Sequence, residues 1–294
     1  MTSHPYLLKN EWIIYIMTPM KNHILQLQEL VYIRDEQKLL KGDCHLDNLN
    51  ASINKMKSNL PAEVKLSFER LSKKSPIVIV PVSSGGCGGC GMHIPISLIQ
   101  SLRNKDEIQY CPNCAKMIYY QEDAPRNVTK SARRGEPLKV GIARFSDVKI
   151  MLPKIKAKNT EEVLEALALV LEEKEFVDKS SKLVEKALER EAIISTGFEN
   201  GLAFPHVRGV EGGALTLAIA TLKTPIRFNP ASKDQTSIVF FAAIPATASV
   251  FYLKLLAGIT KSMQKQANKD KLLEAETQAE LWKALVRVTK ATIK

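Results

Sequence analysis

Residues 195–208 read STGFENGLAFPHVR, and this stretch decides more about the fold and the chemistry of the chain than any other. Glycines punctuate its first half, which predicts a turn. The apolar run from Gly201 to Phe204 predicts a short strand, and Pro205 fixes φ directly before His206. We therefore expect the imidazole where a short strand meets a loop, at the surface.

The chemistry of His206 follows from its side chain. A neutral imidazole accepts a phosphoryl group near pH 7 without a helper base, because its pKa lies close to neutrality and a ring nitrogen is nucleophilic. A Pro-His pair alone also fits a histidine held in a turn by backbone carbonyls. The pair by itself leaves both interpretations open.

A wider comparison of the motif favours the first interpretation. The run from Thr196 to Arg208, preceded by Glu189-Arg190-Glu191, resembles the active-site segment of the fructose/mannitol/nitrogen-regulatory type of enzyme IIA of the bacterial phosphoenolpyruvate-dependent phosphotransferase system. TLKTPIRF (221–228) and SIVFFAAIP (237–245) continue the resemblance, which covers roughly residues 140–294. It implies an α/β sandwich with a central mixed sheet, and a phosphoryl group that His206 receives from the histidine phosphocarrier protein and passes to a IIB domain.

The resemblance also implies a role for Arg190. This residue ends a helical stretch predicted over 180–190, and its planar guanidinium would face His206 and stabilise the charge of the transferring group. The alternative is an ordinary solvated helix residue. Arg208 is a weaker candidate, and the alternative for it is a surface charge only. Backbone N–H groups of a glycine-containing loop can bind phosphate oxygens, and the expected phosphate-facing loop comprises Thr196, Gly197, Asn200 and Gly201.

One departure from the family pattern concerns Tyr252. Many members have a second histidine at the start of the helix after the strand, and ATASVFYLKLL (246–256) offers Tyr252 there. A tyrosine hydroxyl can bond to a phosphate oxygen or to the imidazole but carries no positive charge. The site is therefore slower, differently tuned, silent, or regulatory rather than part of sugar uptake, and regulation is the interpretation we favour.

A second motif consists of four cysteines in two Cys-x-x-Cys pairs, a spacing typical of a zinc ribbon. Four thiolates complete a tetrahedron, so we expect one structural zinc ion with no open position; free thiols or two disulfides are the alternatives. His93 is expected to be a surface histidine rather than a ligand. The predicted ligands are Cys87, Cys90, Cys111 and Cys114.

The N-terminal part resembles the C4-type zinc-ribbon family, whose members join a helical hairpin to a small ribbon. Apolar residues step by three and four along two segments, a pattern typical of coiled-coil seams. Lys41-Gly42-Asp43 between them predicts the turn of an antiparallel hairpin. The seam packs the hairpin or, alternatively, a homodimer, and Cys44 near the turn is a bystander. The seam residues are Met20, Ile24, Leu27, Val31, Leu46, Leu49, Ile53, Met56 and Leu60.

Length, charge and spacing together predict four segments. The 294 residues carry a net charge of +11, and residues 126–158 hold ten Lys/Arg against two Asp/Glu. This basic segment predicts a solvated tether or, alternatively, a nucleic-acid contact through phosphates. We expect a helical hairpin at 1–75, a zinc ribbon at 76–120, a basic linker at 121–139 and an enzyme IIA-like domain at 140–294.

Hydropathy predicts a cytoplasmic protein. The apolar patch Trp12–Met17 is too short to span a bilayer, and the N-terminus lacks the pattern of a signal peptide. Reduced cysteines suit that compartment. In the C-terminal half we expect helices near 160–173, 178–190, 249–265 and 276–290, and strands near 202–205, 215–222 and 237–244, with Asn159 capping the first helix.

Overall fold

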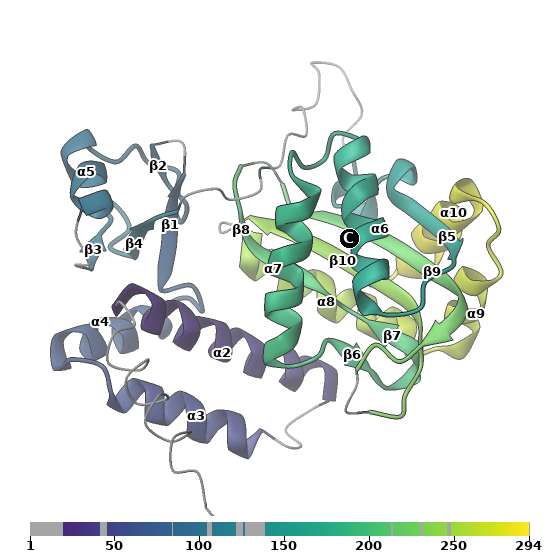
Figure 1. Cartoon of the computed structure of the whole chain (residues 1–294), viewed down its shortest axis with the longest axis horizontal. Helices are drawn as coiled ribbons and strands as arrows, with labels where there is room; N and C mark the ends of the chain where they lie inside the picture. The colour runs from purple at the N-terminus through teal and green to yellow at the C-terminus, as the bar shows by residue number, and fades with distance from the viewer. Residues whose placement is uncertain are drawn as a thin grey trace, which may run out of the picture. The chain divides into compact units, whose positions relative to one another are not determined.

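The computed structural model describes residues 20–41, 46–83, 85–104, 108–121, 126, 139–212, 214–229, 232–245 and 248–293. The chain divides into two compact units, Met1–Gln121 and Glu122–Lys294 (Figure 1). Trp12–Met17, Cys44 and most of the expected linker 121–139 lie outside the described residues. Within the described ranges, no helix combines the length and apolarity needed to cross a membrane.

The N-terminal unit begins with three helices: α2 Met20–Lys41, α3 Asp47–Ser58 and α4 Ala62–Ser72. Helices α2 and α3 run antiparallel, since the His23 ring nitrogen Nε2, near the start of α2, lies 2.9 Å from the carbonyl oxygen of Met56, near the end of α3. The predicted seam is buried within one chain: Ile24 and Leu27 are 0% exposed and Ile53 is 1% exposed. The expected hairpin is thus formed, with α4 as an additional helix that starts after Pro61.

A small four-stranded sheet follows in the same unit. Its strands are β1 Ile79–Ser83, β2 Gly86–Cys87, β3 Gln109–Tyr110 and β4 Met117–Tyr120, with α5 Ile96–Asn104 between β2 and β3. The strand order is β2-β1-β4-β3. Strand β1 pairs parallel with β4, and both outer strands pair antiparallel with their neighbours.

Helix α2 ties the helices and the sheet into one unit. The Gln28 side chain accepts hydrogen bonds from the backbone N–H groups of Val78 and Ile79 at 2.7 and 2.9 Å, and donates to the carbonyl of Ile79 at 3.1 Å. Tyr32 of the same helix is 2% exposed and packs in the apolar cluster of the ribbon with Val80 and Cys111. The helices therefore share a core with the ribbon.

The C-terminal unit is built on a six-stranded mixed sheet. Its strand order is β5-β9-β10-β7-β6, and β8 also pairs with β10. Strand β5 pairs parallel with β9, and β7 and β8 pair parallel with β10, whereas β9 with β10 and β6 with β7 pair antiparallel. The strands are β5 Met151–Ile155, β6 Gly197–Phe198, β7 Leu202–Ala203, β8 His206–Val210, β9 Thr216–Ile226 and β10 Thr236–Pro245.

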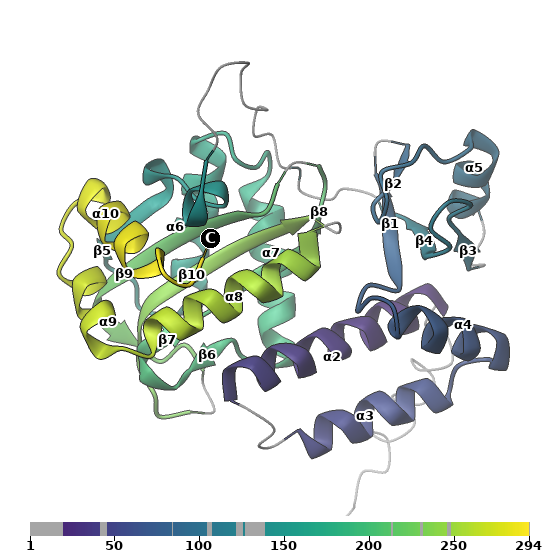
Figure 2. The same cartoon turned by 180° about the vertical axis from the view of Figure 1, so that it is seen from behind.

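Helices cover both faces of this sheet. Helices α6 Thr160–Glu173 and α7 Ser180–Ile193 lie in front of it in Figure 1. Helices α8 Ser249–Met263, α9 Gln266–Leu273 and α10 Gln278–Thr289 lie on the opposite side, which faces the viewer in Figure 2. The central strands are nearly continuous apolar runs because both of their faces are covered. The predicted α/β sandwich with a mixed sheet is confirmed.

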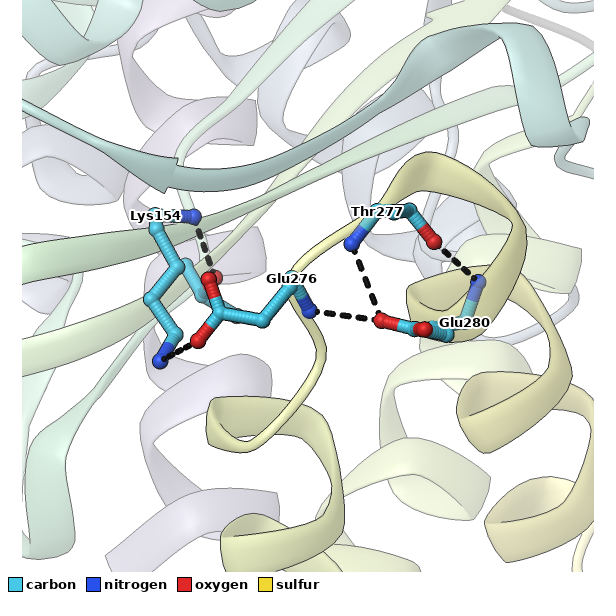
Figure 3. A network of polar contacts seen from close by, with 5 residues as sticks. Lys154, Glu276, Thr277 and Glu280 are labelled. Carbon is cyan, nitrogen blue, oxygen red and sulfur yellow. Dashed lines mark hydrogen bonds and ion pairs between the residues drawn. The ribbon is translucent and has the colours of Figure 1, made fainter.

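The helix boundaries agree with the predicted periodicity, and their caps explain why. The Asn159 side chain accepts from the backbone N–H of Glu162 at 2.9 Å, so α6 starts where its cap is predicted. Thr277 and Glu280 form a reciprocal capping box at α10 (Figure 3). Beside it, Lys154 of β5 binds Glu276 at 2.7 Å. The sequence did not predict β5, β6, β8 or α9, which are short or polar.

Of the expected basic linker, Arg126 has described contacts. Its backbone N–H donates to a carboxylate oxygen of Asp178 at 2.7 Å, and its Nε donates to Glu211 at 2.7 Å. Glu211 directly follows β8. Residues 122–125 and 127–138 lie outside the described residues, so the linker remains a prediction there.

Candidate phosphoryl-transfer site and zinc centre

His206 is the first residue of β8 and pairs with Ala242 of β10. Phe204, two residues before His206, stacks on Phe240 of β10 with ring centroids 5.3 Å apart, and this contact holds the start of β8 against β10. The expected surface position is wrong: His206 is 1% exposed. Side chains from α7 and α8 cover the ring, and the local sequence carries no sign of either helix.

Two hydrogen bonds define the state of the His206 imidazole. Nε of Arg190 donates to Nε2 of His206 at 3.3 Å. Because a guanidinium has only donors, Nε2 must be the unprotonated nitrogen. Nδ1 then carries the proton and donates to the carbonyl oxygen of Phe204 at 3.2 Å. The site therefore presents a neutral imidazole with the lone pair of Nε2 directed at Arg190.

Arg190 lies in the last turn of α7 and is 8% exposed. Its Nη1 donates to the carbonyl of Ile194 at 2.9 Å, which holds the guanidinium against the imidazole. The structure thus places Arg190 against His206, as the resemblance implied, and excludes the solvated alternative. One positive charge is fixed at the edge of the ring that bears the lone pair.

Glu191 organises the segment after α7, a role that the sequence analysis missed. Its carboxylate accepts from the backbone N–H and the hydroxyl of Thr196, both at 2.7 Å, and from the Ser195 hydroxyl. Burial raises the pKa of Glu191, and the bonds from Ser195 and Thr196 offset part of that rise. Thr196 in turn accepts from the N–H of Phe204 at 3.1 Å, next to His206. The sequence signal available for this role was an acidic residue, Glu191, shortly before the pair Ser195-Thr196.

The expected phosphate-facing loop must be corrected for Asn200 and Gly201. Leu202 pairs with Ile238 and His206 pairs with Ala242, four residues further along β10. At roughly 3.3 Å per residue, the turn before Leu202 lies more than about 13 Å from His206. Asn200 and Gly201 instead form the tight turn between β6 and β7, where Gly201 has φ +80°. Gly197 is the first residue of β6 and pairs with Ala203. Thr196 is the member of the predicted set that lies near the histidine.

The backbone carbonyl of Asn200 contacts a side chain of α9. Asn200 has φ 69°, and its carbonyl accepts from Nζ of Lys269 at 3.2 Å. Lys269 is 7% exposed, a burial that the sequence did not predict. This contact stabilises the turn between β6 and β7, which lies beyond Leu202 on the side away from His206.

Tyr252 of α8 closes the other side of the imidazole. Its hydroxyl lies 3.4 Å from Nδ1 of His206, and the two ring centroids are 5.2 Å apart. It is 3% exposed. Tyr252 is therefore in contact with the candidate phosphoacceptor, at the place where the resemblance led us to look for a second histidine.

For Arg208 the structure excludes the alternative of a surface charge only. Its guanidinium carbon lies 5.4 Å from the centroid of the Tyr252 ring, and its Nε and Nη1 atoms are buried. The reason is strand geometry: residues two apart project to the same face, so Arg208 follows His206 toward α8. The site thus contains two guanidinium groups.

The four predicted zinc ligands converge in the N-terminal unit. Their sulfur atoms all lie within 4.8 Å of one another, and the Cys87–Cys114 and Cys90–Cys111 sulfur pairs are each 3.7 Å apart. Four thiolates at about 2.3 Å from a zinc ion would be separated by roughly 3.8 Å, so the sulfurs fit a tetrahedral zinc site. His93 is exposed and outside this group.

Local backbone geometry explains why the two cysteine pairs can converge. The residue after each second cysteine, Gly91 or Ala115, adopts a left-handed conformation with φ 77° or 56°. Burial raises the pKa of the Cys87 thiol to about 12. These observations match the predicted knuckles.

Comparison with known proteins matches one family model to a part of each half of the chain. The family model described as "Phosphoenolpyruvate-dependent sugar phosphotransferase system, EIIA 2" matches residues 145–288, and the model described as "C4-type zinc ribbon domain" matches residues 87–118. The chain is 31% identical over 127 residues to a nitrogen regulatory protein of Pseudomonas aeruginosa, covering 43% of this chain and 82% of that protein.

Two further similarities concern the same half of the chain. A fructose-specific EIIA component of Haloferax volcanii is 27% identical over 112 residues, which cover 38% of this chain and 73% of that protein. The crystal structure of the nitrogen regulatory protein IIA-Ntr from Neisseria meningitidis is similar with a TM-score of 0.44 and 20% identity, covering 48% of this chain and 97% of that one.

Proposed function

Since this chain belongs, through residues 145–288, to the EIIA 2 family of the phosphoenolpyruvate-dependent sugar phosphotransferase system, we propose that it carries a phosphoryl group on His206. The observation that carries the proposal is the pair of bonds on the imidazole: Arg190 at Nε2 and the Phe204 carbonyl at Nδ1. Nδ1 keeps its proton, so Nε2 is the nucleophile.

The transfer step balances without a base. The bond between phosphorus and the donor's nitrogen breaks as the bond between phosphorus and Nε2 forms, and no proton changes place. The positive charge that develops on the imidazole is stabilised by the Phe204 carbonyl, which faces Nδ1. Catalysis then consists of positioning and charge stabilisation, the usual means of phosphoryl transfer.

Arg190 has two tasks in this proposal. In the resting site its Nε–H covers the lone pair of Nε2. Phosphorylation therefore requires the guanidinium to turn from the nitrogen to the phosphoryl oxygens, where its fork of N–H donors fits the new charge. Because His206 is 1% exposed, the donor reaches Nε2 only as this movement occurs.

We further propose that the histidine phosphocarrier protein is the donor and that a IIB domain or a regulatory target is the acceptor. The relatives support two physiological roles, since their names are a fructose-specific EIIA component and a nitrogen regulatory protein. Regulation is the role we favour, because the zinc-ribbon unit adds a binding module to the phosphocarrier. One zinc ion held by the four cysteines would be structural, as four thiolates leave no open position.

The decisive experiment incubates the purified full chain with phosphoenolpyruvate, enzyme I and the histidine phosphocarrier protein. Intact mass should show one acid-labile phosphoryl group in the wild type and in the matched control His93→Ala, and none in His206→Ala. His93 suits this control because it is an exposed histidine of the zinc-ribbon unit. An adduct that persists in His206→Ala would refute the assignment.

Tyr252 supports a second candidate function. A site without a second histidine could be silent, and the chain would then act through its ribbon as a binding protein for nucleic acid or another protein. No adduct on the wild type with a matched donor, together with salt-sensitive binding of the full chain to DNA or RNA, would favour this function.

A further inference from the structure

Two guanidinium groups belong to the surroundings of the His206 imidazole, one in contact with the imidazole itself and one in contact with the Tyr252 ring. Arg190 of α7 contacts Nε2 at 3.3 Å. Arg208 of β8 lies over the Tyr252 ring at 5.4 Å, and that ring lies 5.2 Å from the imidazole. Arg190, His206, Tyr252 and Arg208 thus form one continuous cluster.

The length of the arginine side chain lets Arg208 act on His206. Two residues along a strand are separated by roughly 6.6 Å and share a face. An extended arginine side chain covers such a distance, so its guanidinium can reach a group attached to the neighbouring imidazole. On β8, His206 can therefore hold the phosphoryl group while the guanidinium of Arg208 lies beside that group.

The charge of the ligand indicates why a second cation is useful. A phosphoryl group carries about −1.5 to −2 charges near pH 7, and Arg190 supplies a single positive charge. Tyr252 supplies a donor but no charge. Its ring instead supports Arg208, since a guanidinium over an aromatic face is held by the ring's electrons. In these buried surroundings the attraction between cation and anion is stronger than in water.

We propose that Arg208 is a second cationic catalytic residue, which binds the phosphoryl oxygens on the Tyr252 side of His206 while Arg190 binds them on the other. This inference rests on the proposed function of His206. It gives Tyr252 the role of a platform for Arg208 rather than of a direct ligand. The group that the cluster binds is then a tetrahedral dianion.

The test uses phosphoramidate, a small phosphoryl donor that needs no protein partner. The bond between phosphorus and nitrogen of phosphoramidate breaks, ammonia leaves, and the bond to Nε2 forms. Arg208→Met removes the charge, and Arg208→Lys restores it. Arg227→Met is the matched control, because Arg227 is exposed and follows β9 at the end remote from Ala242. Thermal unfolding verifies that each variant is folded.

The expected result is a decrease of roughly 10-fold or more in the rate of adduct formation for Arg208→Met. Arg208→Lys should recover most of the rate, and Arg227→Met should stay within about threefold of the wild type. An unchanged rate in a folded Arg208→Met protein would overturn the inference and leave the function of His206 intact.

A second measurement separates this inference from the proposed function. Titration with inorganic phosphate, followed by the NMR signals of the His206 ring, reports anion binding without covalent chemistry. If the wild type forms no adduct but phosphate shifts these signals in the wild type and not in Arg208→Met, the phosphocarrier function fails and the anion site stands. If neither adduct nor shift appears, both proposals fail.

Discussion

At the scale of single residues, Arg190 makes contacts that lysine cannot reproduce. Its Nε faces His206 while its Nη1 binds the Ile194 carbonyl. Arg190→Lys keeps the charge but loses this double contact, so we expect phosphorylation of His206 to slow by roughly 10-fold or more. Single-turnover transfer from the phosphorylated phosphocarrier protein measures the rate. A lysine variant as fast as the wild type would show that charge alone is required.

Glu191 leads to a prediction about pH. Burial raises the pKa of this carboxyl, so the folded protein retains its proton at a higher pH than the unfolded chain does. The unfolded chain therefore binds fewer protons as pH rises above about 4.3, and the free energy of unfolding falls with pH until the folded carboxyl also ionises. Glu191→Gln lacks this contribution because an amide does not titrate.

The stability of the wild type relative to Glu191→Gln should therefore be greatest in acid and should decline as pH rises toward neutrality. Urea unfolding of the C-terminal unit, followed by Trp282 fluorescence in a Trp12→Phe background, measures the difference at each pH. A difference that stays constant across this range would mean that the carboxyl has the same pKa in both states.

At the scale of secondary-structure elements, α2 is joined to β1 through one side chain. Gln28→Ala removes three hydrogen bonds and leaves two backbone N–H groups of buried residues without their acceptor. We expect a loss of about 2–3 kcal/mol in the free energy of unfolding of the N-terminal unit. Hydrogen–deuterium exchange of peptides that cover β1 measures this loss.

Gln26→Ala is the matched control for that experiment, because Gln26 lies on the same helix with its side chain exposed. Hydrogen–deuterium exchange of the β1 peptides in Gln26→Ala should equal that in the wild type. Equal protection in Gln28→Ala as well would show that apolar packing of Tyr32 alone holds α2 against the ribbon.

At the scale of the whole molecule, the proposed zinc site and the proposed phosphoryl-transfer site belong to different units. The four cysteines all belong to Met1–Gln121, whereas His206 and Arg190 belong to Glu122–Lys294. Removal of zinc with a strong chelator should lower amide protection in β1 to β4, because the four converging thiols then lose their common ligand. Protection in β9 and β10 should stay unchanged.

Metal analysis provides the controls for this prediction. The wild type and Cys44→Ser should each hold one zinc ion per chain, and Cys111→Ser should hold less or none. Bound zinc in Cys111→Ser at the level of the wild type would exclude the four-cysteine centre.

By itself, the sequence determined those features in which chemistry is local or periodic. Spacing predicted the cysteine ligands, helical periodicity predicted α2, α6 and α7, and continuous apolar runs predicted β9 and β10. The motif around His206 indicated the phosphotransferase fold and Arg190. Each of these signals lies within one element or within a few residues of it.

Only the tertiary structure decided which distant side chains meet. Strand register moved the turn at Asn200 away from His206, and strand alternation turned Arg208 toward Tyr252 of a helix that follows two strands later. Gln28 meets β1 some fifty residues further along the chain. Such contacts depend on pairing register and on packing between elements, which no local pattern encodes.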